Sequence, residues 1–92
     1  MNVILEGKRL QDPQEAYPYL KEKLDLPDHF GENLDALYDC LTEICGMSII
    51  RIEAMMPEES EFYRRLIRVM QDAADENRQL ELRIAHGYYV EG

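Results

Sequence analysis

The residues with the clearest chemical potential lie between Lys23 and Arg51, where the chain has six carboxylates and no lysine or arginine. These acids are Asp25, Asp28, Glu32, Asp35, Asp39 and Glu43. The last three are spaced four residues apart, so a helix over residues 33–45 would place them on one face. Like charges at that spacing destabilise an isolated helix by about 0.2–0.5 kcal/mol per pair. Stability alone does not explain this acidic face, which therefore indicates a function.

Three interpretations of the acidic face remain open from charge and spacing alone. It could be a solvated surface. The positive end of the helix dipole would favour Asp35 in the first turn, but it would not favour Asp39 in the middle or Glu43 near the negative end. It could bind a cation, although magnesium usually also requires a substrate phosphate and the chain has no phosphate-binding loop. It could instead imitate a row of phosphates and dock into a basic pocket of another protein.

A nucleophilic site around Cys40 is a weaker interpretation. Side chains of adjacent helical residues point about 100° apart, so Asp39 and Cys40 do not share a face. Acidic neighbours would also raise the pKa of the thiol and reduce its reactivity. We expect Cys40 and Cys45 to be buried thiols rather than zinc ligands, and we expect no metal and no cofactor. His86 follows the last predicted strand without an evident partner and is expected at the surface.

The composition restricts the class of protein. The 92 residues carry a net charge of −9, and the sequence pI is about 4.6. This charge argues against direct nucleic-acid binding and against adhesion to anionic membranes, whereas it suits a basic protein partner. The sequence shows neither a signal peptide nor a transmembrane segment, so we expect a cytoplasmic protein. Its length predicts one domain, residues 1–92.

The first half of the chain predicts a strand, two helices and a connector. The apolar run at residues 3–5 is typical of a buried strand. A helix follows from Pro13 with Asp12 as its N-cap, and it ends before Pro27. Residues 27–32 form a connector. Asn33 is a good N-cap for the acidic helix, which we expect to close at Gly46.

The second half predicts a strand at 47–52, a helix that starts near Pro57 and closes at Asn77, and a strand at 80–84. Glu61 with Arg65 is expected to form an i,i+4 ion pair on this helix. Helical connections between strands favour parallel pairing. The predicted fold is therefore α/β, a three-stranded parallel sheet packed by three to four helices.

Residues 26–41, LPDHFGENLDALYDCL, closely resemble the barstar family. Barstars are intracellular inhibitors of barnase-type secreted ribonucleases. The resemblance extends weakly over nearly the whole chain, and it implies the same parallel-sheet fold. It also implies that the chain is no enzyme. A barstar blocks the ribonuclease active site with its second helix and the connector before it.

By that resemblance, Asp39 would enter the phosphate pocket of the enzyme, and Asp35 would pair with a basic residue at the edge of the pocket. Asp72 would add a carboxylate from the last helix, although it fits equally as an i,i+4 partner of Arg68. His29 would take the place of a tyrosine that stacks on the catalytic histidine of the enzyme. The remaining partner contacts implied come from Gly31, Asn33, Tyr38, Thr42 and Glu43.

The chain departs from the prototype at three aromatic positions, with His29 for tyrosine, Tyr38 for tryptophan and Ile44 for another aromatic residue. An imidazole at position 29 can still stack, but it titrates near neutral pH. The leading hypothesis is a monomeric inhibitor or immunity protein for a basic secreted or toxin-type ribonuclease. The alternative is a barstar-fold adaptor or regulator of another basic protein, with a small metal-binding enzyme as a distant third.

Overall fold

The computed structural model describes residues 1–85, and residues 86–92, which include His86, lie outside the described part. The elements are β1 (Asn2–Glu6), the short 3-10 helix η1 (Gly7–Leu10), α1 (Pro13–Lys23), α2 (Leu34–Thr42), β2 (Ser48–Glu53), α3 (Glu61–Glu76) and β3 (Leu80–Ala85). Within residues 1–85, no helix is long and apolar enough to cross a bilayer.

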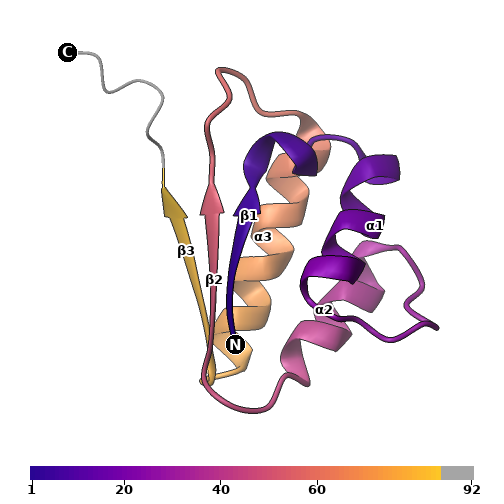
Figure 1. Cartoon of the computed structure of the whole chain (residues 1–92), viewed down its shortest axis with the longest axis vertical. Coiled ribbons are helices and arrows are strands. Elements are labelled where there is room, and N and C mark those ends of the chain that lie inside the picture. Colours follow the sequence, from indigo (N-terminus) through magenta and orange to yellow (C-terminus); the bar gives the residue numbers. More distant parts are fainter. Residues whose placement is uncertain (86–92) are drawn as a thin grey trace.

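The three strands form one sheet in the order β1-β2-β3, and both pairs are parallel (Figure 1). Leu5 pairs with Ile52, which in turn pairs with Ile84, so the register aligns apolar residues across the sheet. The connection from β1 to β2 contains α1 and α2, and α3 connects β2 to β3. This arrangement confirms the predicted α/β fold with a three-stranded parallel sheet and helical crossovers.

The two faces of the sheet differ in burial. On one face, Leu5, Ile50 and Ile52 are almost fully buried beneath the helices. On the other face, Ile4 is 57% exposed and Arg51 lies in solvent. The predicted strand at residues 3–5 is confirmed, but Ile4 is not buried as predicted, because the helices of the described part cover only one face of the sheet.

Close contacts at the carboxyl end of β1 fix α1 against the sheet. The Tyr19 hydroxyl accepts a hydrogen bond from the Glu6 backbone N–H at 2.9 Å. A Cβ atom on Gly7 would lie 3.0 Å from the carbonyl oxygen of Glu53, so a larger residue here would force a small shift of the backbone. Asp12 occupies the predicted N-cap position of α1, but its side chain makes no capping hydrogen bond.

The helix α3 starts later than the sequence suggests. We expected its start near Pro57, but its first residue is Glu61, and the Ser60 hydroxyl accepts a hydrogen bond from the Tyr63 backbone N–H at 3.0 Å. The Ser60 hydroxyl also donates a hydrogen bond to the backbone carbonyl of Gln11 at 2.7 Å. The expected pair of Glu61 with Arg65 forms at 3.4 Å. Asn77 is the C-cap, as predicted.

Candidate functional site

The start of α2 is fixed by Asn33, which also holds the connector of residues 27–32. Its Oδ1 atom accepts a hydrogen bond from the Ala36 backbone N–H at 2.8 Å, and its Nδ2 atom donates to the Gly31 carbonyl at 3.2 Å. Such a cap is worth about 1 kcal/mol relative to alanine. The prediction of Asn33 as the N-cap is therefore confirmed, and one side chain sets the entry of the chain into α2.

The end of α2 is fixed from a distant part of the chain. Asn77, at the end of α3, donates from Nδ2 to the carbonyls of Leu41 at 3.1 Å and Ile44 at 3.0 Å. α2 ends at Thr42 and not at residue 45 as predicted. Gly46 adopts the left-handed conformation, with φ of 88°, in the loop before β2 and does not terminate the helix as predicted.

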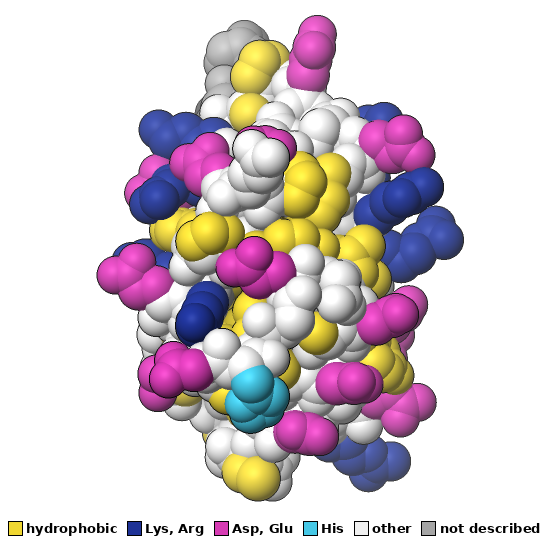
Figure 2. Space-filling model, turned by 90° about the vertical axis from the view of Figure 1, so that its right-hand side faces the viewer, with side chains coloured by type: hydrophobic (Ala, Val, Ile, Leu, Met, Phe, Trp, Pro, Cys, Tyr) yellow, Lys and Arg dark blue, Asp and Glu magenta, His cyan; other side chains and the backbone are white. Residues whose placement is uncertain are grey.

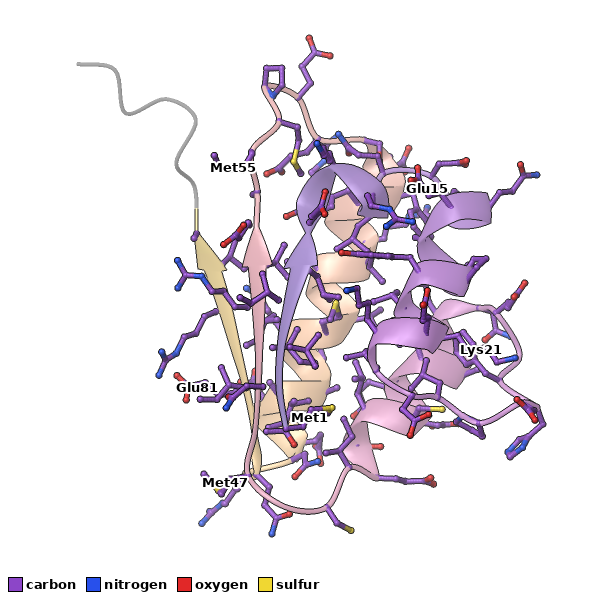
Figure 3. All side chains as sticks on the ribbon, viewed as in Figure 1. Met1, Glu15, Lys21, Met47, Met55 and Glu81 are labelled. Atoms are coloured by element: carbon purple, nitrogen blue, oxygen red, sulfur yellow. The ribbon has the colours of Figure 1, made fainter. Side chains whose placement is uncertain are left out.

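The connector is anchored by Phe30, which is 7% exposed and packs edge-on against Tyr17 with ring centroids 6.0 Å apart. Glu32 adopts a left-handed φ of 53°, which bends the chain just before the N-cap. Lys21 reaches the connector from α1 and lies 3.8 Å from Asp28 (Figure 3). His29, between these anchored residues, is exposed to solvent.

Asp35 and Asp39 lie on α2 with exposed side chains. Within residues 1–85, neither carboxylate has an ion-pair partner or a side-chain hydrogen bond. The Thr42 hydroxyl donates to the backbone carbonyl of Asp39 at 3.0 Å and leaves the carboxylate of that residue free. Glu43 is also exposed, but it is the C-cap and not part of the helix. The acidic face therefore has no internal cation to neutralise it.

Tyr38 marks the place where the acids of α2 and α3 come together. Partial burial raises the pKa of the Tyr38 phenol, and so do the carboxylates of Glu76, Asp72 and Asp39, in that order. α2 and α3 pack against each other, so these acids from two helices lie around one ring. Asp72 and Glu76 on α3 have the same four-residue spacing as Asp35 and Asp39 on α2. This spacing could have identified Glu76 as a candidate, but Glu76 was not predicted from the sequence.

The expected alternative role of Asp72 does not hold. Among the residues that the structure describes, Asp72 and Arg68 form no ion pair within 4.0 Å, whereas Arg65 and Glu61 on the same helix do. The carboxylate of Asp72 lies instead close enough to Tyr38 to raise the pKa of its phenol. Asp72 therefore belongs to the acidic surface between α2 and α3.

The geometry offers little for metal or thiol chemistry. No group of His, Cys, Asp or Glu side chains within residues 1–85 is arranged to hold a metal ion. Cys40 is half-buried, and burial, followed by the carboxylates of Glu43 and Asp39, raises the pKa of its thiol. A raised pKa makes this thiol a weaker nucleophile at neutral pH. Cys45 is exposed, so the prediction that both thiols are buried was wrong.

The predicted site residues differ in how far they are exposed. Figure 2 shows acidic side chains spread around the edge of this view of the molecule and hydrophobic side chains gathered near its centre. The exposed members of the predicted set are His29, Gly31, Asn33, Asp35, Asp39, Glu43 and Asp72. Tyr38 and Thr42 are partly buried.

Comparisons with known proteins show which family the chain is similar to. The family model described as "Barstar (barnase inhibitor)" matches residues 1–87. A protein of Bacillus subtilis (strain 168) named "Putative ribonuclease inhibitor YrdF" is 48% identical over 40 residues, which are 44% of this chain and 44% of that protein. The match thus spans less than half the length of this relative. Because the family model covers nearly the whole chain, the chain belongs to the barstar family.

Proposed function

We propose that this chain is a cytoplasmic inhibitor, not an enzyme, and that it blocks the active site of a small basic ribonuclease of the barnase type. α2 and the connector of residues 27–32 would form the blocking surface. The observation that carries the proposal is the exposed pair Asp35 and Asp39, whose carboxylates have no cation partner within residues 1–85. The family and the name of the Bacillus subtilis relative support a ribonuclease as the partner.

The acidic face suits a phosphate-binding pocket for a geometric reason. Carboxylates four residues apart on a helix start from Cβ atoms about 5–6 Å apart, and such a row can meet arginines and lysines that bind a nucleic-acid backbone. Asn33 and Asn77 hold the two ends of α2, so the row is preorganised before binding. A preorganised surface loses less conformational entropy on association.

Each side chain has a proposed part in the complex. Asp39 enters the phosphate pocket, and Asp35 meets a basic residue at its edge. Asp72 and Glu76 extend the negative surface from α3 across Tyr38, consistent with their effect on the Tyr38 pKa. The residues proposed to complete the contact are His29, Gly31, Asn33, Thr42 and Glu43.

Charge would act in two stages. The net charge of −9 would steer a basic partner toward the protein, and the barnase–barstar pair is itself a standard case of such steering. Once bound, each desolvated carboxylate needs a charged, hydrogen-bonded partner, because removing that partner costs about 3–5 kcal/mol. Affinity would therefore depend on a few carboxylates and not on the total contact area.

The test is a titration of a purified barnase-type ribonuclease with the purified protein at low and at high salt. We expect inhibition at stoichiometric amounts, weakened by salt, with a larger loss for Asp39→Ala than for Asp35→Ala. Circular dichroism would check that both variants fold. Full inhibition by Asp39→Ala would reject the blocking role of α2. Absence of inhibition by the parent protein, combined with capture of a different basic protein, would favour the adaptor hypothesis.

A further inference from the structure

An apolar hollow lies beside the acidic surface, between the amino-terminal ends of the three α-helices. Its volume is about 460 Å³. The residues that line it are Pro13, Tyr17, Leu34, Glu61, Phe62 and Arg65. Four of these side chains are apolar or aromatic, and they come from α1, α2 and α3. The hollow is thus built by tertiary packing and has no counterpart in a local sequence motif.

The aromatic wall of the hollow is held in place by its neighbours. The Tyr17 ring packs edge-on against Phe62 at 5.6 Å and against Phe30 at 6.0 Å. Phe30 belongs to the connector, so the same tyrosine supports both the hollow and the proposed blocking surface. Burial and then the nearby Glu32 carboxylate raise the pKa of Tyr17, which keeps its ring neutral. A preformed apolar hollow of this kind suits an inserted side chain.

The hollow is continuous with the acidic surface. Leu34 precedes Asp35 at the start of α2, and Phe62 lies on α3, the helix that carries Asp72 and Glu76. The line of contact between α2 and α3 therefore passes from the hollow to the acids around Tyr38.

The rim of the hollow is electrically balanced. Arg65 lies 3.4 Å from Glu61, so its positive charge is compensated on the same helix. A basic partner that approaches the acidic surface therefore meets no net repulsion at the hollow. Interfaces commonly place an apolar or aromatic anchor in such a hollow beside charged contacts.

We propose that the hollow receives one apolar or aromatic side chain of the same basic ribonuclease whose active site α2 blocks. This inference rests on the proposed function and adds a second anchor to it. The carboxylates of α2 would supply the contact that salt weakens. The hollow would supply a contact that salt does not weaken, because burial of apolar surface does not depend on screening of charges.

The test fills the hollow from its rim. In Arg65→Trp and Glu61→Trp, an exposed side chain is replaced by a ring large enough to cover the hollow. The two changes move the net charge in opposite directions, so a purely electrostatic effect would strengthen one complex and weaken the other. Arg64→Trp is the matched control, because Arg64 is adjacent on α3 but lines a different hollow with Tyr63 and Ile84. Thermal unfolding would confirm that each variant folds.

We expect both rim variants to inhibit at least about tenfold more weakly than the parent at low and at high salt, as is typical when an anchor is lost. Arg64→Trp should stay within about threefold of the parent, as surface contacts outside an anchor do. Inhibition by Arg65→Trp and Glu61→Trp equal to that of Arg64→Trp would overturn the inference while the proposed function stands. Absence of inhibition by the parent would instead reject the proposed function.

Discussion

Replacement of Asp39 by asparagine should stabilise the free protein while it destroys inhibition. The carboxylate of Asp39 has no ion pair or side-chain hydrogen bond within residues 1–85, so its loss removes no stabilising contact. Asparagine has nearly the same size and helix propensity, and the change therefore isolates the charge. A higher stability of free Asp39→Asn would show that the Asp39 carboxylate destabilises the unbound protein.

The magnitude follows from the neighbours of Asp39. Asp35 lies one helical turn before Asp39, and a like-charge pair at this spacing destabilises a helix by about 0.2–0.5 kcal/mol. Relief of this repulsion should stabilise the protein by about 0.2–0.5 kcal/mol. For a domain of this size, that corresponds to a rise of about 1–4 °C in the melting temperature. Removal of one partner from a buried ion pair should cost the complex about 3–5 kcal/mol.

The assay combines thermal unfolding at low salt with inhibition of the ribonuclease. Glu81→Gln is the control for net charge, because Glu81 pairs with Arg83 at 2.7 Å on the outer side of the sheet (Figure 3). This control should inhibit like the parent, and its stability should change by less than about 1 kcal/mol. A melting temperature of Asp39→Asn several degrees below that of the parent would show a structural role for the carboxylate and refute this reasoning.

Two further predictions concern the support of the site. Asn77→Ala removes the donors that bind the carbonyls of Leu41 and Ile44. Urea unfolding should therefore show a free energy of unfolding lower by about 1–3 kcal/mol. A decrease below about 0.5 kcal/mol would mean that these hydrogen bonds do not hold α2. The Tyr63 hydroxyl is buried without a hydrogen-bond partner among the described residues, and burial followed by the Glu59 carboxylate raises the pKa of this phenol to about 12. Because folding favours the neutral phenol, the stability that this phenol contributes is complete below pH 10 and falls as the pH rises toward 12. Tyr63→Phe has no phenol, so its free energy of unfolding should fall less than that of the parent between pH 10 and 12. Parallel pH profiles of the two proteins would contradict this prediction.

The order of strands and helices was predictable from the sequence because apolar runs alternate with helical segments, and helical crossovers favour parallel strands. The exposure of Ile4 was not predictable, since a short apolar run does not reveal which face of the sheet the helices cover. The end of α2 was misplaced for a similar reason. Asn77 and Leu41 are 36 residues apart, so the hydrogen bond that ends the helix leaves no local signal.

The exposed acidic face of α2 was predictable because Asp35 and Asp39 repeat at helical spacing without intervening basic residues. The contribution of α3 was only partly predictable. Asp72 was weighed against pairing with Arg68, and Glu76 was missed, because the register of α3 against α2 depends on tertiary packing. The hollow beside Leu34 was not predictable at all, since its walls come from three helices.

The most direct test of the central claim is a competition experiment between the protein and a mononucleotide that occupies the active site of a barnase-type ribonuclease. If α2 takes the place of the substrate phosphates, the apparent affinity of the protein for the enzyme should fall in proportion to nucleotide occupancy. Equal affinity for the free and the nucleotide-filled enzyme, in a ternary complex, would contradict the claim that α2 blocks the active site.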